Sequence, residues 1–410
     1  MSVISEDHIE QIVIQDFIDL GYSYVNGADI SPEGISQERD FDEVVLKQRL
    51  RDAIKKINPN VPNDAQEDAI KKLLRSDSPS LFQNNYNIHK YLTEGVDVEY
   101  RKGDRIVGDK VWLIDFENAC NNEFLVVNQF TIIENNVNKR PDIILFINGL
   151  PLVVIELKNA VDENATIHSA FNQLQTYKQA IPSLFLYNAL LIVSDGWEAL
   201  YGSLTGSKQF FVPWKSIDGN VVADEDMPQM EVMAKGMLNK YVLIDLIRHY
   251  VVFHRNKEKI TKIIPRYHQY FAVNKAVETT KKATAEGGDQ RAGVIWHTQG
   301  SGKSLSMVFY AGKLVLALNN PTLVILTDRN DLDDQLFDTF SLSQDVLRQT
   351  PVQAENRDDL KKKLSVTSGG IVFTTIQKFL PEIQEKIDIG EGKTKNIKGQ
   401  FELLSDRRNI

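Results

Sequence analysis

The chain has 410 residues, of which 42% are hydrophobic and 25% charged, and its formal net charge is −9 at pH 7. This composition predicts a globular protein long enough for two or three domains, and the acidic balance argues against a general DNA-coating protein. The single cysteine, Cys120, excludes intramolecular disulfides and cysteine-rich zinc sites. Without a signal peptide or a membrane-spanning apolar run, we expect a soluble, cytoplasmic protein.

The strongest local pattern is the segment RPDIILFINGLPLVVIELKNA. Two apolar runs, residues 143–147 and 152–157, are separated by Asn148-Gly149, the dipeptide that is typical of a type I′ hairpin turn. The pattern predicts two paired antiparallel strands, with Asp142 opposite Glu156.

Three charged side chains then gather at the open end of this hairpin. Because side chains alternate along a strand, Glu156 and Lys158 point to one side while Leu157 points to the other. Asp142, Glu156 and the Leu157 carbonyl are hard oxygen ligands suited to Mg²⁺, and Lys158 could orient a water molecule and stabilise charge on a phosphate. The residues predict a metal-dependent nuclease site, with an ordinary cross-strand ion pair on a solvated face as the alternative.

The segments that follow have weaker patterns. AFNQLQTYKQA predicts a helix on which Gln173 and Tyr177 share one face and could reach the scissile phosphate, although a plain amphipathic helix is the alternative. We place the catalytic sheet at residues 113–201. Residues 218–228 are polar and turn-rich, so they predict a loop, and the basic run 254–266 is best interpreted as a solvated linker helix.

A second site pattern lies in AGVIWHTQGSGKSLSMVFYAGKL, where a buried strand at residues 294–296, a glycine-rich turn and an apolar helix are predicted. In such a loop, backbone N–H groups bind phosphates, the lysine reaches the β and γ phosphates, and the serine hydroxyl holds Mg²⁺. His297 stands where the first glycine is usual, and a simple glycine-rich turn is the alternative. The nucleotide-binding residues predicted here are Gly300, Ser301, Gly302, Lys303 and Ser304.

Two further strand patterns, in PTLVILTDRNDLDDQLFDTF and GGIVFTTIQKFL, alternate with helix patterns as in a parallel α/β sheet. Each strand ends in polar residues, which could simply cap the next helix. The two segments resemble helicase motifs Ia and Ib, and this resemblance implies that the strand ends contact the backbone of one nucleic-acid strand. The candidates for DNA contact are Arg329, Thr374, Thr375 and Gln377.

Taken together, these segments resemble the R subunit of type I restriction enzymes. The hairpin resembles the PD-(D/E)xK nuclease core, Gln173 and Tyr177 match the Gln-x-x-x-Tyr element of its RecB-like members, and the later loop resembles that of superfamily 2 helicases. The resemblance runs from SEDHIEQIVIQDFIDLGYSYVNG to ILTDRNDLDDQLF. It implies an α/β fold with a restriction-endonuclease-like domain at residues 1–255 and a RecA-like P-loop lobe with a parallel sheet at residues 256–410.

The resemblance also implies an activity, in which double-stranded DNA is translocated with ATP and cut with Mg²⁺. The implied partners are a specificity (S) subunit, which reads the DNA, and methyltransferase (M) subunits. Arg266 and Gln269 match the adenine-binding element of these helicases, and Glu10 matches an acid near the nuclease metal. A basic helix start and a solvated helix face are the respective alternatives. The implied catalytic residues are Asp142, Glu156, Lys158, Gln173 and Tyr177.

The sequence departs from the family pattern at its end, LLSDRRNI, which comes before the expected Asp-Glu-Ala-His segment. We therefore expect ATP binding without efficient hydrolysis, in an N-terminal fragment of a longer protein or a natural truncation. Two other interpretations stay open. A helicase–nuclease of DNA repair would use the same residues without a methyltransferase partner, and a non-enzymatic module would only hold ATP, grip DNA and dock partners.

Overall fold

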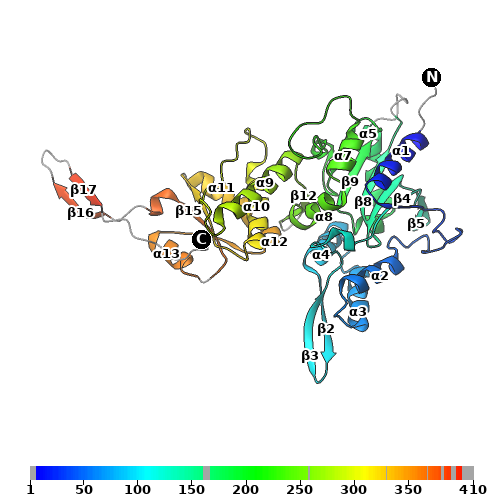
Figure 1. Cartoon of the computed structure of the whole chain (residues 1–410), viewed down its shortest axis with the longest axis horizontal. Coiled ribbons are helices and arrows are strands. Elements are labelled where there is room, and N and C mark those ends of the chain that lie inside the picture. Colours follow the sequence, from blue (N-terminus) through cyan, green and yellow to red (C-terminus); the bar gives the residue numbers. More distant parts are fainter. Residues whose placement is uncertain are drawn as a thin grey trace. The chain divides into compact units, whose positions relative to one another are not determined.

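The computed structural model has a mixed α/β fold that divides into two compact units, residues 1–268 and 269–410 (Figure 1). The residues that it describes are 6–159, 167–256, 259–328, 330–366, 368–379, 383–388 and 394–398. Among them, no helix is long and apolar enough to cross a membrane. The cytoplasmic location stays a prediction.

The first unit is built on a six-stranded mixed sheet in the order β1-β4-β7-β8-β9-β10. The strands are β1 (Ser23–Asn26), β4 (Phe124–Asn128), β7 (Ile143–Ile147), β8 (Leu150–Leu157), β9 (Leu190–Ser194) and β10 (Ala199–Gly202). The β1–β4 and β8–β9 pairs are parallel, and the other neighbours are antiparallel. The predicted sheet is confirmed except at its edge, where the sequence analysis missed β1.

Two helices pack on this sheet and contact its central strands. Helix α1 (Glu6–Asp19) contacts β1, β4 and β8, and helix α5 (Ile167–Ala180) contacts β8 and β9. Every residue of β8 is buried, so the strand is covered on both faces, and apart from Glu156 its sequence is a continuous apolar run instead of an alternating one.

The rest of the first unit consists of short strands and helices around this sheet. The helices are α2 (Lys47–Ile57), α3 (Asn63–Leu74), α4 (Leu81–Glu94), α6 (Pro182–Phe185), α7 (Gln229–Gly236) and α8 (Lys240–His249), and the 3₁₀ turns are residues 119–121 and 208–210. The small strand pairs are β2 (Val96–Lys102) with β3 (Arg105–Val111), and β5 (Ile132–Glu134) with β6 (Val137–Lys139). Residues 218–228 form the predicted loop.

The β7–β8 hairpin has the predicted turn. Asn148 and Gly149 both have positive φ angles, 53° and 77°, as a type I′ turn requires. The Gly149 carbonyl also accepts a hydrogen bond from the Leu46 backbone N–H, at 3.0 Å, so the turn is fixed to the segment that leads into α2. The turn sets the register of the Phe146–Pro151 and Ile147–Leu150 pairs, and a one-residue shift between Leu145 and Phe146 then brings Ile143 opposite Ile155. The turn also sets the place where the hairpin docks.

The linker helix predicted for the basic run 254–266 is wrong. Strands β11 (Val252–Arg255) and β12 (Ile260–Ile263) form an antiparallel hairpin there instead. Its apolar Phe253 packs with Tyr86 of α4, and tertiary packing of this kind overrides local helix propensity. The hairpin belongs to the first unit, although the predicted domain boundary lies inside it; the domain assignment stays a prediction.

The same hairpin buries a lysine without a carboxylate partner. Lys262 is 2% exposed, and its ammonium donates hydrogen bonds to the Asn188 carbonyl and, at 3.1 Å, to Asn85 Oδ1. Its backbone N–H donates to Thr205 Oγ1 at 2.7 Å. Neutral acceptors offset only part of the cost of burying a charge, so burial lowers the pKa of Lys262 to about 7.

The second unit contains a three-stranded parallel sheet in the order β13-β15-β14. Its strands are β13 (Leu323–Thr327), β14 (Pro351–Gln353) and β15 (Ile371–Thr375), and a separate pair is formed by β16 (Ile383–Asp388) and β17 (Thr394–Lys398). The helices are α9 (Tyr267–Thr284), α10 (Lys303–Ala317), α11 (Asn330–Ser341), α12 (Gln344–Leu347) and α13 (Arg357–Leu364), with a 3₁₀ turn at residues 376–379. The predicted parallel α/β pattern is confirmed.

The strand predicted at residues 294–296 is wrong. These residues have no regular structure, and Val294 and Trp296 are 94% and 89% exposed. A strand is held by the backbone hydrogen bonds of a neighbouring strand, and none of the described strands pairs with this segment. The apolar sequence alone was therefore insufficient to form a strand.

The hairpin turn gives a first prediction. An alanine Cβ at Gly149 would lie 2.5 Å from the Leu46 carbonyl oxygen, whereas one at Gly103, which also has a positive φ of 64°, would meet nothing within 4 Å. We expect Gly103→Ala to lower the free energy of unfolding by about 1–2 kcal/mol through backbone strain alone. Gly149→Ala should cost about 1–3 kcal/mol more, because the backbone must also shift. Urea unfolding measures the free energy of unfolding of both variants. Equal losses of stability would contradict a clash between a Cβ at Gly149 and the Leu46 carbonyl oxygen.

Lys262 gives a second prediction, on pH. Between about pH 7 and 10.5 the unfolded chain binds more protons at this lysine than the folded chain, so its contribution to the free energy of unfolding rises with pH. The stability of Lys262→Met relative to the unsubstituted protein should therefore fall, by on the order of 2 kcal/mol from pH 7 to 9.5. Lys259→Met, on an exposed residue of the same hairpin, is the control. If the difference in the free energy of unfolding between Lys262→Met and the unsubstituted protein did not change with pH, the lowered pKa of Lys262 would be contradicted.

Candidate active site

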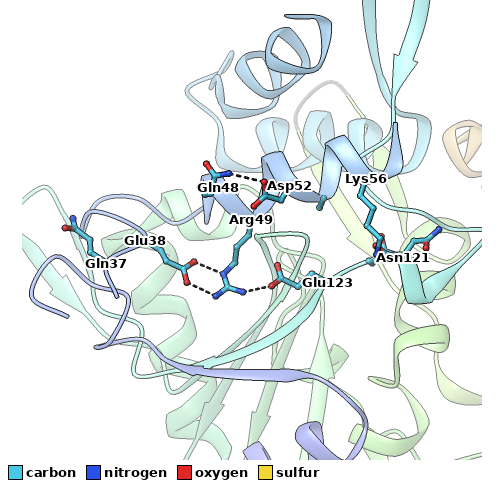
Figure 2. Close-up of a pocket in the computed structure, with 10 residues that line it drawn as sticks. Gln37, Glu38, Gln48, Arg49, Asp52, Lys56, Asn121 and Glu123 are labelled. Atoms are coloured by element: carbon cyan, nitrogen blue, oxygen red, sulfur yellow. Dashed lines mark hydrogen bonds and ion pairs between the residues drawn. The ribbon is translucent and has the colours of Figure 1, made fainter. Parts of the chain in front are cut away.

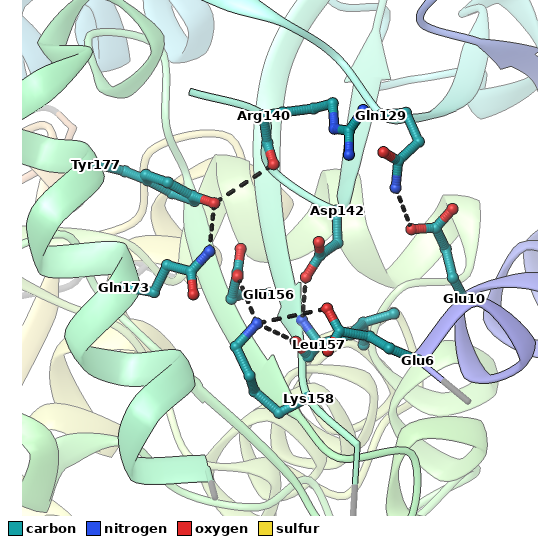
Figure 3. A network of polar contacts seen from close by, with 10 residues as sticks. All are labelled: Glu6, Glu10, Gln129, Arg140, Asp142, Glu156, Leu157, Lys158, Gln173 and Tyr177. Atoms are coloured by element: carbon teal, nitrogen blue, oxygen red, sulfur yellow. Dashed lines mark hydrogen bonds and ion pairs between the residues drawn. The ribbon is translucent and has the colours of Figure 1, made fainter. Parts of the chain in front are cut away.

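The predicted metal ligands meet where β7 begins and β8 ends (Figure 3). Ile143 pairs with Ile155, so the next position in the antiparallel register sets Asp142 opposite Glu156, as predicted. Asp142 Oδ2 accepts a hydrogen bond of 2.7 Å from the Leu157 backbone N–H. This bond ties the two strand ends together and fixes the Asp142 carboxylate beside the end of β8.

Lys158 lies among these oxygen atoms. Its Nζ donates to Glu156 Oε1 at 2.9 Å and to the Leu157 carbonyl at 2.6 Å, which confirms that Glu156 and Lys158 point to the same side. Only 12% of the Lys158 side chain is exposed, and Glu156 is fully buried. The Lys158 ammonium thus places a positive charge between two of the predicted metal ligands, Glu156 and the Leu157 carbonyl.

Burial controls the protonation of this cluster. It raises the pKa of Glu156 to about 9, with repulsion from Asp142 adding to the effect and Lys158 opposing it. It also raises the pKa of Asp142 to about 6, although the Leu157 N–H and Lys158 favour the charged form. For Lys158, burial lowers the pKa, but the charges of Glu156, Asp142 and Glu6 together with the hydrogen bond to Glu156 outweigh it, and the net shift is upward. Both acids therefore hold their protons to a higher pH than usual even with Lys158 beside them, and a metal ion at the cluster would favour their charged forms.

One oxygen atom in the cluster also lacks a partner. Glu156 Oε2 is buried and accepts no hydrogen bond from the residues that the structure describes. Its polar neighbour, the Tyr177 hydroxyl, accepts a hydrogen bond from Gln173 Nε2 and donates one to the Arg140 carbonyl, and its interaction with Glu156 contributes to the raised tyrosine pKa. A buried carboxylate oxygen without a donor is costly, and a hard cation would satisfy it. The donor set therefore fits Mg²⁺.

Helix α1 contributes acids from the other side. Glu10 is buried, and its two oxygens accept hydrogen bonds from Asn128 Nδ2 at 2.6 Å and Gln129 Nε2 at 2.7 Å. Its predicted role as a metal ligand stays a prediction. No cluster of three His, Cys, Asp or Glu side chains positioned for one metal occurs among the described residues. The ligand set argued here therefore rests on two carboxylates and one backbone carbonyl.

The sequence analysis missed Glu6. Its Oε1 lies 3.6 Å from Lys158 Nζ, and its charge helps to raise the pKa of both Asp142 and Glu156. Glu6 and Glu10 are four residues apart on α1, so they share a helix face. That spacing was the signal that could have found Glu6.

Helix α5 presents Gln173 and Tyr177 to the cluster, as Figure 3 shows. Gln173 Nε2 donates to the Tyr177 hydroxyl at 2.6 Å, so the predicted shared face is confirmed. Tyr177 is 3% exposed, and burial together with the nearby Glu156 raises the pKa of its hydroxyl. The hydroxyl consequently stays protonated and able to donate. Catalytic roles for both residues stay predictions.

In the second unit, the predicted phosphate-binding loop has the backbone of a tight turn. Gly300 and Gly302 have positive φ angles of 79° and 82°, and α10 begins at Lys303, with Ser304 in its first turn. Lys303 Nζ donates to the His297 and Thr298 carbonyls, both at 3.1 Å.

Gln269 reaches this loop, because its Nε2 donates to the Gly302 carbonyl at 3.0 Å. A Cβ on Gly302 would lie 2.7 Å from the same Nε2 atom, and the positive φ of Gly302, 82°, favours glycine in its own right. The structure thus brings the predicted residue Gln269 to the loop. Arg266 lies in the first unit, and its role in adenine binding stays a prediction.

The four residues expected to contact DNA have different environments. Thr374 and Thr375 are buried in β15, whereas Gln377 is exposed and donates to the Asp328 carbonyl at 3.3 Å. Arg329 lies outside the described residues. Their contact with DNA stays a prediction.

A large open hollow lies elsewhere, around Arg49 (Figure 2). It has a volume of about 660 Å³, and its central guanidinium is already paired with Glu38, at 2.6 Å, and with Glu123. Its Gln48 side chain likewise donates to Asp52 at 3.0 Å. Since these groups satisfy one another, the hollow does not compete with the carboxylate cluster as the candidate active site.

Comparison with known proteins points to one family. Residues 3–210 match the family model for the N terminus of the type I restriction enzyme R protein, and residues 268–410 match the model for the SWI2/SNF2 ATPase.

Curated relatives agree with these matches. The endonuclease subunit of the type I restriction enzyme HindI from Haemophilus influenzae is 44% identical over 100% of the chain and 38% of its own length. The putative MjaIXP endonuclease subunit from Methanocaldococcus jannaschii is 34% identical over 99% of the chain and 39% of its own length. The chain thus spans well under half the length of these relatives. Because the first family model covers half of the sequence, the chain belongs to the family of type I restriction enzyme R proteins.

Proposed function

We propose that this chain is the endonuclease portion of a type I restriction enzyme together with part of its ATP-driven DNA translocase. The observation that carries the proposal is the cluster of Asp142, Glu156, the Leu157 carbonyl and Lys158 at paired strand ends. The cluster supports a PD-(D/E)xK nuclease domain in the first unit. The SWI2/SNF2 match and the loop before α10 support a RecA-like motor lobe in the second.

In the proposed site, Asp142, Glu156 and the Leu157 carbonyl would hold Mg²⁺. A bound Mg²⁺ supplies a Lewis acid and makes a water molecule more nucleophilic. Lys158 is placed to stabilise negative charge on the scissile phosphate, because its ammonium already lies beside Glu156. Tyr177 keeps its proton and is oriented by Gln173, so it can donate a hydrogen bond to a phosphate oxygen. We assign catalytic roles to Lys158, Gln173 and Tyr177 on this basis.

In the second unit, we propose that the loop binds the phosphates of ATP. The amino-terminal end of α10 has free N–H groups that favour an anion, and Lys303 supplies a positive charge beside them. Ser304 would hold Mg²⁺ beside the phosphates, and Gln269, with Arg266, would read the adenine. Double-stranded DNA is the proposed substrate, and the methyltransferase (M) and specificity (S) subunits are the proposed partners.

The relatives disfavour a helicase–nuclease of DNA repair, because both of those named above are endonuclease subunits of type I restriction enzymes. A non-enzymatic module makes a different prediction from an enzyme, since it would bind DNA without cutting it. The cleavage experiment below separates the two.

The proposal predicts that the natural protein, purified with its partner subunits, cuts unmethylated circular DNA in the presence of Mg²⁺ and ATP. Glu156→Ala should reduce cutting at least about a hundredfold, the scale expected when an electrostatic stabiliser of a transition state is lost. Glu225→Ala, on an exposed loop residue, is the matched control and should cut normally. A methyltransferase among the copurified subunits would support the restriction function over repair.

Other outcomes of the same assay would contradict parts of the proposal. Normal cutting by Glu156→Ala would place the nuclease site elsewhere, and cutting without ATP would separate the nuclease from the motor. No cutting by the unsubstituted protein would favour the non-enzymatic module.

A further inference from the structure

The β2–β3 pair is a two-stranded ribbon that extends away from the rest of the first unit (Figure 1). At its base, Val96, Val98 and Val111 are buried, and both strands contact α3. Beyond these residues the ribbon is largely exposed. Each strand has seven residues, which corresponds to roughly 20 Å of extended chain. The ribbon is thus anchored at one end and open to solvent at the other.

Charges are compensated at the base of this ribbon. Lys110 forms an ion pair of 3.0 Å with Asp97, and the Tyr100 hydroxyl donates to Asp109 at 3.0 Å. These contacts run across the two strands and stabilise their pairing, as opposite charges and hydrogen-bonding pairs do in a β-ladder. The base therefore needs no outside partner.

The tip is different, because two of its basic side chains lie directly opposite each other. Lys102 is paired with Arg105 in the strand register, and Arg101 is paired with Ile106, which is 74% exposed. All three basic residues are exposed, and none forms a hydrogen bond or ion pair with the residues that the structure describes. Like charges directly opposite each other weaken a ladder. The tip thus has a concentration of positive charge that does not help the ribbon to fold.

Charged residues on an exposed ribbon also protect it from pairing with other strands. Charge of either sign would give that protection. The tip instead carries Arg101, Lys102 and Arg105 against a single acid, Asp104, in a chain whose net charge is −9. The excess of positive charge at the tip therefore favours a negatively charged partner.

We propose that the tip of the β2–β3 ribbon binds the phosphate backbone of double-stranded DNA. This inference rests on the proposed function, in which DNA is the substrate. The major groove is about 12 Å wide and admits a two-stranded ribbon, whose basic tip can then reach the phosphates on its edges. Contacts of this kind position the DNA without reading its sequence, so the ribbon would hold duplex beside the nuclease domain whatever its sequence.

The test is DNA binding by the 410-residue chain, measured by fluorescence anisotropy of a labelled duplex at several salt concentrations without Mg²⁺. The variant combines Arg101→Thr, Lys102→Thr and Arg105→Thr, since threonine keeps the strand propensity. The control combines Lys55→Gln, Lys71→Gln and Lys215→Gln, which remove the same charge from exposed residues of the same unit. Thermal unfolding of both variants checks that each is folded.

We expect the tip variant to bind at least about tenfold more weakly at moderate salt, and the slope of log K against log salt to become shallower by roughly 2–3, as loss of three phosphate contacts requires. The control should bind like the unsubstituted chain. The inference would be overturned if the tip variant bound DNA as tightly as the unsubstituted chain, or if the control lost as much affinity as the tip variant. Either result would leave DNA as the substrate. Absence of binding by the unsubstituted chain would overturn the ribbon's role as an independent DNA contact, whereas the cleavage assay with the partner subunits tests DNA as the substrate.

Discussion

The burial of the Glu156 carboxyl is the constraint on which the rest of the site depends. Glu156 lies fully buried at the end of β8, a strand that is covered on both faces. Burying a carboxylate costs several kcal/mol unless other groups compensate its charge. Lys158 compensates one oxygen atom, and the other has no partner among the described residues. In this structure the raised pKa of Glu156 favours a proton on the carboxyl, and a divalent cation would take the place of that proton.

The surrounding fold serves to keep this cluster in place. The Asn148-Gly149 turn and the register shift between Leu145 and Phe146 set the pairing of the hairpin, and the Asp142 bond to the Leu157 N–H joins the two strand ends. Helix α5 brings Gln173 and Tyr177 to one side, and helix α1 brings Glu6 to the other. Each contribution comes from a different part of the chain, so loss of the sheet would disperse them all.

What could be predicted from sequence depended on whether the signal was local. The hairpin, its turn and the shared face of α5 follow from dipeptide chemistry and periodicity, so they were predicted correctly. The hairpin at β11–β12 and the exposed segment 294–296 depend on packing partners or on neighbouring strands, which no local pattern encodes. Strand β1 was missed for the same reason, because it pairs with residues more than a hundred positions away. For Glu6, the four-residue spacing from Glu10 was a local sign of a shared helix face, but no local pattern encodes its contact with Lys158.

The central claim is that the oxygens around Glu156 form a metal site. The most direct test is a crystal structure of the chain grown with Mn²⁺, in which anomalous scattering locates the ion. We predict an ion bound by Asp142, Glu156 and the Leu157 carbonyl, with Lys158 Nζ moved away from at least one of its present contacts with Glu156 and Leu157. Manganese bound only elsewhere, with the Lys158 contacts unchanged, would contradict the account.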